Sequence, residues 1–194
     1  MRNLSWALLM CAFAIPSNAQ QETILYKAGM IQAAPGKLLD LIDLEKKMTA
    51  DAENSPGDPA PLWMRHSQGD RWDLLILYPI GNYSEYYQPE RIAKRAQADV
   101  SVNLGQKFQQ DIAWQEDLFV SGPDLALLRK AFAEGAFFHV EMFVALPGKL
   151  AELKQERIME NSYARALKQP ENFIFVRDQG AAWVMGQSRF PQTR

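Results

Sequence analysis

Two side chains with complementary acid–base chemistry lie two residues apart in one apolar run. His139 and Glu141 belong to Ala136 to Ala145 (AFFHVEMFVA), a β-like segment. Side chains at i and i+2 of a strand point to the same face, so the Glu141 carboxylate can orient the His139 imidazole and raise its basicity. We interpret the pair as the candidate catalytic site. A solvated contact on an open sheet face is the alternative.

The other histidine, His66, stands beside Arg65 just before a Gln-Gly turn, where a surface hairpin position is expected. With two histidines and one cysteine, Cys11, the chain offers a poor ligand set for zinc. A single histidine can serve as the axial ligand of haem, and His139 is the candidate for that role. The sequence itself identifies no cofactor.

Five side chains are candidates for holding a small hydrophobic or aromatic ligand: Lys27, Arg65, Trp72, Phe143 and Trp183. The two tryptophans can stack on a ring, although shared packing explains their similar settings equally well. The two cations can attract an anionic group, and Phe143 shares a strand face with His139.

The charge balance argues against a nucleic-acid partner. The chain has 21 Lys and Arg against 23 Asp and Glu, without a basic cluster. Pro35-Gly36-Lys37 also lacks the glycine spacing of a phosphate-binding loop. The chemistry therefore has to be sought on the elements that position the aromatic and histidine side chains.

These elements come in two similar sets. Met30 to Leu38 (MIQAAPGKL) recurs 112 positions later as Met142 to Leu150 (MFVALPGKL). In the same order, Gln68 to Trp72 (QGDRW) is matched by Gln179 to Trp183 (QGAAW). Two matches at nearly one offset indicate an internal duplication.

The first 19 residues have the features of an export signal. Arg2 supplies a positive start, Trp6 to Ile15 is apolar but too short to span a bilayer, and Ser17-Asn18-Ala19 is a small-x-small cleavage pattern. We expect a signal peptide at 1–19, a mature chain starting at Gln20, and a periplasmic or secreted location. The mature chain then has no cysteine, no transmembrane anchor, and relies on burial for stability.

Hydrophobic periodicity predicts the elements of the first set. A strand from Thr23 to Ala33 and a helix from Leu38 precede a hairpin whose strands are Leu62 to Ser67 and Trp72 to Ile80. A long amphipathic stretch from about Ser84 to Trp114 and a short strand at Asp117 to Val120 follow.

The second set repeats this order but stops early. After a linker helix from Asp124 to Glu134 come a strand at Ala136 to Ala145, a helix at about Lys149 to Lys168, and a hairpin of Asn172 to Arg177 with Ala182 to Phe190. No counterpart of the last helix and strand follows within the sequence given.

The predicted fold class is therefore α+β, with two tandem ferredoxin-like (β-α-β-β-α-β) units in an α/β-barrel-like arrangement. The boundaries are 20–122 for the first unit, 123–135 for the linker helix and 136–194 for the second unit, incomplete at its C-terminus. Strand alternation suggests that Phe138, Val140 and Met142 lie under the helices. His139, Glu141 and Phe143 then face the barrel or cleft, as do Lys27 and Ile31 in the first unit.

With its Pro-Gly-Lys junctions at Pro35-Gly36-Lys37 and Pro147-Gly148-Lys149, the chain resembles the dimeric α/β-barrel superfamily in tandem form. That group includes the antibiotic-biosynthesis monooxygenase-like, NIPSNAP-like and stress-responsive barrel domains. The polar turns followed by Trp72 and Trp183 are most similar to the NIPSNAP-like type. The resemblance implies a fold and no single activity, because members range from monooxygenases and haem enzymes to proteins without known activity.

The sequence favours a non-catalytic or small-ligand-binding barrel protein. The alternative is a cofactor-independent monooxygenase or haem enzyme built on His139 and Glu141, and a structural subunit is a third reading. The incomplete second unit is expected to leave an apolar face uncovered, including some of Phe173, Phe175, Trp183 and Met185. Such a face predicts self-association or a partner chain, unless the linker helix folds back over it.

Overall fold

A computed structural model of the chain describes residues 23–53, 58–68, 70–98, 103–135, 137–180 and 184–189. The predicted signal peptide and Trp183 lie outside these residues. The elements, in chain order, are β1 (Thr23–Ala33), α1 (Leu38–Glu53), β2 (Leu62–Arg65), β3 (Leu74–Gly81), α2 (Tyr83–Tyr86), α3 (Pro89–Ala98), α4 (Asn103–Gln110), β4 (Ile112–Pro123), α5 (Leu125–Glu134), β5 (Phe138–Phe143), α6 (Leu150–Ala166), β6 (Phe173–Gln179) and β7 (Val184–Arg189).

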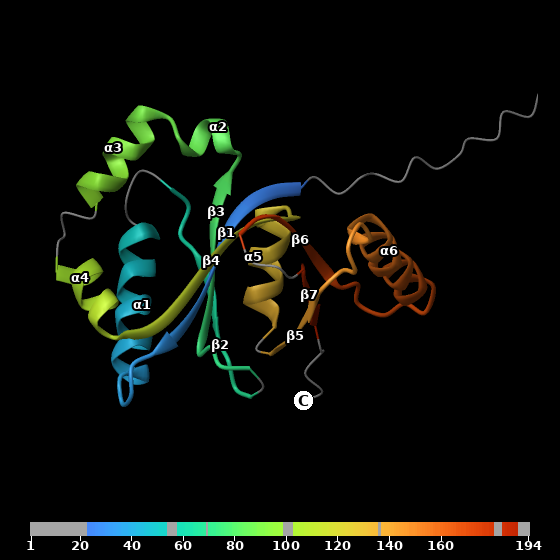
Figure 1. Cartoon of the computed structure of the whole chain (residues 1–194), viewed down its shortest axis with the longest axis horizontal. Helices are drawn as coiled ribbons and strands as arrows, with labels where there is room; N and C mark the ends of the chain where they lie inside the picture. The colour runs from blue at the N-terminus through green and yellow to red at the C-terminus, as the bar shows by residue number, and fades with distance from the viewer. Residues whose placement is uncertain are drawn as a thin grey trace, which may run out of the picture.

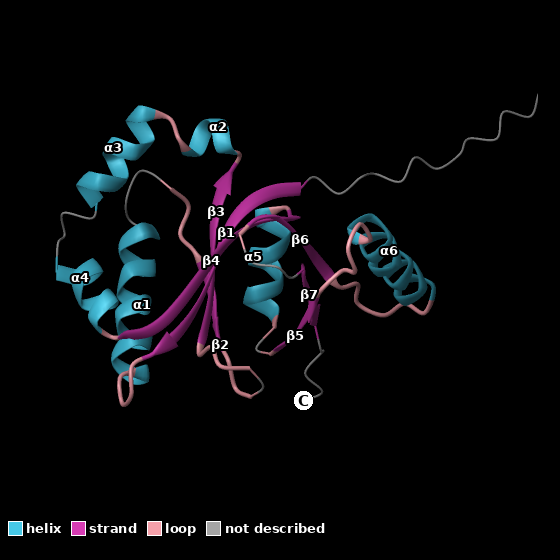
Figure 2. Ribbon diagram, viewed as in Figure 1, coloured by secondary structure: helices cyan, strands magenta, loops and turns pink. Residues whose placement is uncertain are grey.

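The strands form an open antiparallel sheet with the order β2-β3-β1-β4-β6-β7-β5 (Figure 2). The five strands β2-β3-β1-β4-β6 make one ladder, and β7 and β5 continue it beyond β6. The α+β class is therefore confirmed, but the expected barrel is not closed. Its two ends are β2 and β5, and no strand within the described ranges joins them.

The two ends of this sheet follow the same local order. Central strand β1 pairs with β3 on one side and with β4 on the other, and β3 pairs with β2. Likewise β5 pairs with β7, and β7 pairs with β6. β4 pairs with the second edge of β1, whereas no described strand pairs with the corresponding edge of β5.

The sheet carries one apolar core on each face. The inner core lies on the face covered by α5 and contains Tyr26, Ala28, Met30, Leu62, Trp72, Leu75, Leu77, Leu118, Val120, Leu128 and Phe175. The outer core lies under α1 and α4 and contains Ile31, Leu41, Leu44, Leu74, Ile76 and Phe108. Figure 1 shows α1 and α4 on one side of the sheet and α5 on the other. Each fully buried side chain of this size contributes roughly 1.5–3 kcal/mol.

Helix α5 is the predicted linker helix, and its ends are where the sequence places them. The Asp124 carboxylate accepts hydrogen bonds from the backbone N–H groups of Ala126 and Leu127, and Gly135 caps the other end. Leu128 and Ala131, one turn apart, are buried. The helix folds back onto the inner face, so it covers part of the surface that the incomplete second unit was expected to expose. Phe175, predicted to be uncovered, is fully buried.

The predicted assignment of strand faces is reversed. Val140 and Met142 pack against the inner core, whereas Phe143 lies on the other face beneath the Arg157 guanidinium of α6, 4.5 Å from it. In the first half Ile31 lies under α1 rather than in a cleft. The predicted alternation of side chains between the two faces of each strand is right. The error arose because α5 and the neighbouring strands, rather than α1 and α6, cover the more apolar face.

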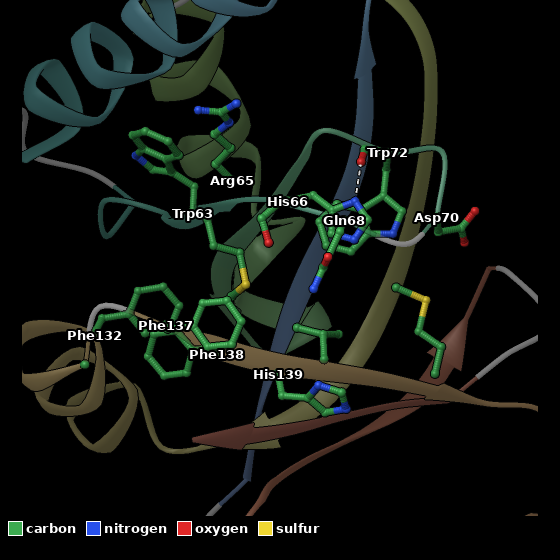
Figure 3. A pocket seen from close by; sticks show the side chains of 15 residues that line it. Trp63, Arg65, His66, Gln68, Asp70, Trp72, Phe132, Phe137, Phe138 and His139 are labelled. Carbon is green, nitrogen blue, oxygen red and sulfur yellow. Dashed lines mark hydrogen bonds between the residues drawn. The ribbon is translucent and has the colours of Figure 1, made fainter. Parts of the chain in front are cut away.

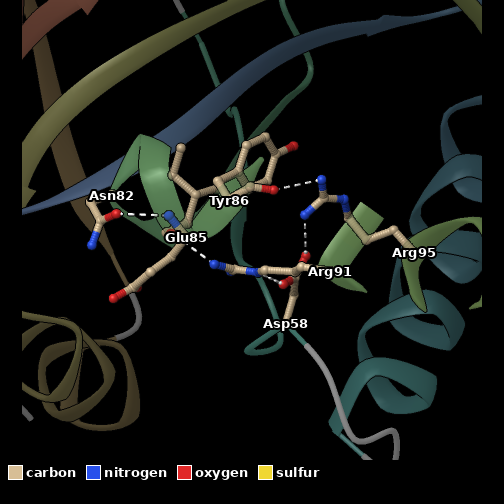
Figure 4. A network of polar contacts seen from close by, with 7 residues as sticks. Asp58, Asn82, Glu85, Tyr86, Arg91 and Arg95 are labelled. Atoms are coloured by element: carbon tan, nitrogen blue, oxygen red, sulfur yellow. Dashed lines mark hydrogen bonds and ion pairs between the residues drawn. The ribbon is translucent and has the colours of Figure 1, made fainter. Parts of the chain in front are cut away.

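The region after β3 also differs from its prediction. The stretch expected to be one long amphipathic segment contains α2, α3 and α4, and β4 begins at Ile112 and extends over twelve residues. A polar network holds α3 in place: Arg91 and Arg95 both contact the Asp58 carboxylate (Figure 4). Arg95 also donates to the Tyr86 carbonyl at 2.8 Å.

Candidate functional site

A pocket of about 800 Å³ opens between the two ends of the sheet. On one side lie β2 and the hairpin that follows it, and on the other lie β5 and the end of α5 (Figure 3). The lining combines aromatic and aliphatic side chains with polar ones, most of which come from the hairpin: Trp63, Met64, Arg65, His66, Ser67, Gln68, Asp70, Trp72, Phe132, Gly135, Phe137, Phe138, His139, Val140 and Met142. Ligand sites commonly combine apolar walls with polar groups that fix the orientation of the ligand.

The polar end of the pocket is built around Trp72. Its ring stacks on that of His66, with centroids 4.0 Å apart and planes at 17°. The His66 Nδ1 atom lies 2.8 Å from the Trp72 carbonyl oxygen. A carbonyl only accepts, so Nδ1 carries a proton and donates it to this hydrogen bond. The hairpin thus fixes the orientation of His66.

Trp72 also carries an unsatisfied donor. The side chain is 4% exposed, and its buried indole N–H has no acceptor among the described residues. Buried polar groups are nearly always hydrogen-bonded, because desolvating an unpaired one costs free energy. Trp72 lines the pocket, but the surrounding side chains enclose its N–H, so a ligand acceptor meets this donor only when they shift.

The apolar wall joins α5 to β5. Phe132 and Phe138 stack with centroids 4.7 Å apart, and Phe137 beside them is exposed. In Figure 3 these three rings and Trp63 surround one end of the pocket, while Gln68 extends from the hairpin toward β5. This wall offers apolar contact to one part of a ligand, and the hairpin offers hydrogen bonds to another.

The side chains of the predicted pair, His139 and Glu141, are in contact. His139 Nε2 lies 3.2 Å from Glu141 Oε1, and the side chains are 47% and 45% exposed. His139 lines the pocket, but Glu141 is not among its lining residues. The pair is thus at the rim, where water screens its charges. A haem iron within the pocket would have no enclosed imidazole from this pair, so the residues fit such a group poorly.

The five predicted ligand-binding residues are not brought together. Arg65 and Trp72 line the pocket. Lys27 lies elsewhere, paired with Asp117 at 2.9 Å, and Phe143 is under α6. Trp183 lies outside the described residues.

Several pocket residues were missed in the sequence. His66 was expected at a plain surface hairpin, and Phe138 was assigned to the helix-covered face. The available signal was the hairpin spacing, which places His66 and Trp72 on either side of one turn and so allows their rings to meet. Nothing in the sequence signalled that α5 would bring Phe132 to the same place.

No group of three or more potential metal ligands occurs in the part of the chain that the structure describes. Within that part, too, every helix is too short or too polar to cross a membrane. Comparison with protein-family models, with characterised proteins and with solved structures gives no significant match.

Proposed function

We propose that this protein is a non-catalytic binding protein whose ligand occupies the pocket between β2 and β5. The observation that carries the proposal is the buried, unpartnered N–H of Trp72 in the pocket lining. The ligand has an apolar or aromatic body, which contacts Phe132, Phe137 and Phe138, and an acceptor atom for the indole. His66, whose ring stacks on that of Trp72, lines the same pocket.

Binding of an apolar dye, anilinonaphthalene sulfonate, tests the proposal. We expect saturable binding with one site per chain. Trp72→Phe keeps the ring but removes the donor, so it weakens binding by roughly two- to tenfold, the value of one net hydrogen bond. Phe138→Ala removes part of the apolar wall and weakens binding further. Unchanged affinity in both variants would refute the site.

Trp114→Phe is the matched control for the loss of an indole. Trp114 lies on β4 and stacks with the Arg71 guanidinium at 4.0 Å, and it is not among the lining residues. Its substitution should leave the dye affinity as it is in the parent protein, so a general effect of indole loss is separated from an effect at the pocket.

The alternative function is a cofactor-independent monooxygenase that uses His139 and Glu141, and the 3.2 Å contact between them favours it. Oxygen consumption in the presence of aromatic substrates separates the two proposals. Consumption that is lost in His139→Ala would support the enzyme. No consumption, together with dye binding, would support the binding protein.

We further infer that the chain consists of two ferredoxin-like units related by duplication, as in tandem members of the dimeric α/β-barrel superfamily. The matching orders β2-β3-β1 and β6-β7-β5 support this. So do Ala28 and Met30, whose counterparts 112 positions later, Val140 and Met142, contact the same inner core. An experimental structure in which Trp72 and Trp183 occupy non-equivalent strands would contradict it.

We also propose that the protein is exported and starts at Gln20 after cleavage. Arg2, the apolar run and Ala19 support this reading. Intact-mass measurement of protein from the native host tests it, and a mass that includes residues 1–19 would overturn it.

A further inference from the structure

The outer edge of β5 corresponds to the edge of β1 that pairs with β4 in the first half of the sheet. β1 pairs with β4 along eleven residues, from Thr23 opposite Pro123 to Ala33 opposite Ile112. Among the residues that the structure describes, β5 is the last strand of the sheet and its ladder is with β7. An edge strand with open backbone groups is a template for another strand. FHVEMF contains neither proline nor lysine, and Glu141 is its one acidic residue.

The space beside this edge suits a single strand. The pocket next to β5 is bounded on its far side by Trp63, Met64 and Arg65 of β2. A second copy of the chain would have to bring β7 and α6 along with its own β5. A single extended segment needs less room than a second copy, because it only has to lie at the roughly 4.8 Å spacing of neighbouring strands.

The side chains of β5 specify the chemistry of that segment. In the ladder between β1 and β4, Leu118 is paired with Ala28, and both belong to the inner core. The next pair, Asp117 and Gly29, lies on the opposite face of the sheet. The counterparts on β5 are Val140 and Glu141. A Cβ added at Gly29 would lie 3.2 Å from the Asp117 carboxylate, so a side chain at this position meets the residue opposite it. Glu141 therefore repels an acidic residue there and favours a basic one.

We propose that the ligand of the pocket is an extended polypeptide segment that adds antiparallel to β5, with an apolar residue opposite Val140 and a lysine or arginine opposite Glu141. The inference rests on the proposed binding function and names its ligand class. Apolar side chains of the segment enter the aromatic pocket, and a backbone carbonyl is a suitable acceptor for the Trp72 N–H.

Two synthetic peptides test this proposal by fluorescence anisotropy. Both have the β4 sequence of residues 112–123, one unchanged and one with Asp117→Lys. We expect the Lys peptide to bind the full chain about three- to tenfold more tightly than the Asp peptide, the size of a cross-strand charge effect. The Glu141→Lys protein should show the reverse preference, which a defect in folding cannot produce.

A second measurement tests the backbone pairing. Methylating the amide nitrogens at alternate peptide positions should abolish binding for one set of positions and preserve it for the other, because β5 receives hydrogen bonds from one edge only. Equal binding of the Asp and Lys peptides, or equal tolerance of both methylated sets, would overturn the strand proposal. So would sedimentation showing a dimer that Glu141→Lys dissociates, because β5 would then serve a second copy. If the apolar dye binds and neither peptide does, the pocket function stands and the strand inference fails.

Discussion

The ring of Phe175 meets the ring of Tyr26 edge-on, with centroids 5.9 Å apart and planes at 70°. Tyr26 belongs to β1 and Phe175 to β6, and β4 runs between them. Gly122 of β4 lies at the point of contact, where an added Cβ would overlap the Phe175 ring and lie 3.2 Å from Tyr26. The Tyr26 hydroxyl donates to the Pro123 carbonyl at 2.6 Å. The two halves of the sheet are thus joined through a position that requires glycine for space.

Gly122→Ala should therefore destabilise the protein. The methyl group has to displace buried rings, and overpacking of this kind costs roughly 1–3 kcal/mol. Urea unfolding followed by tryptophan fluorescence measures the free energy of unfolding. Gly105→Ala is the control: the residue lies in helix α4 with open space around its Cα, so alanine should be neutral or stabilise by up to about 1 kcal/mol. Equal stability of the two variants would contradict the packing at Gly122.

The sequence predicts well those features that depend on local chemistry. The α+β class, the hairpins, the Asp124 cap of α5 and the contact of His139 with Glu141 all follow from spacing along the chain. The closed barrel and the strand faces were wrong, because they depend on which elements cover which side of the sheet. The pocket needed Phe132, His66 and Phe138, and only the packing of α5 against β5 brings these distant residues together.

The Asp58 carboxylate should contribute more to the free energy of unfolding than an ordinary surface charge does. Its carboxylate contacts Arg91 and Arg95 at once, and the latter guanidinium lies 4.1 Å from the centre of the Tyr86 ring (Figure 4). Asp58→Ala leaves two partly buried cations without this partner, which we expect to cost about 1–2 kcal/mol of unfolding free energy.

Glu171→Ala is the comparison for Asp58, because it breaks the exposed pair with Arg165. An exposed pair contributes at most about 1 kcal/mol. Chemical denaturation of both variants measures the difference. A smaller loss for Asp58→Ala than for Glu171→Ala would show that the network does not hold α3 against the rest of the fold.

His66 makes two interactions with Trp72 that can be removed one at a time: its ring stacks on the indole, and its Nδ1 donates to the Trp72 carbonyl. His66→Phe retains an aromatic ring to stack on Trp72 but removes the hydrogen bond to the Trp72 carbonyl, so we expect a loss of about 0.5–1.5 kcal/mol. His66→Ala removes both interactions and should cost more. Thermal unfolding of the two variants checks the order, and equal melting temperatures would argue against the stacked arrangement.

Stability should fall as pH rises through the range in which Glu45 titrates. Glu45 is a fully buried residue of α1. Thr49 donates to its Oε1 at 3.4 Å, and its Oε2 has no hydrogen-bond partner within the described residues. Burial, only partly opposed by the Thr49 hydrogen bond, raises the pKa of the Glu45 carboxyl from 4.5 to about 7. The folded protein therefore holds a proton that the unfolded chain releases earlier.

The sign of the effect follows from this difference. Below pH 4.5 both states are protonated and the stability is fully present. Between 4.5 and about 7 the unfolded chain ionises first, so the free energy of unfolding declines, by at most roughly 3 kcal/mol. Above pH 7 this contribution is constant. Glu45→Gln cannot ionise and should remove that decline, so its advantage over the parent protein grows from pH 4.5 to 7.

Urea unfolding at several pH values between 4 and 8 measures this slope. Asp43→Asn on the same helix is the control, because 77% of the Asp43 side chain is exposed and the variant should keep the slope of the parent protein. If Glu45→Gln were destabilising to the same degree at every pH, the buried carboxyl would be ionised in the folded protein, and a compensating cation near α1 would have to exist.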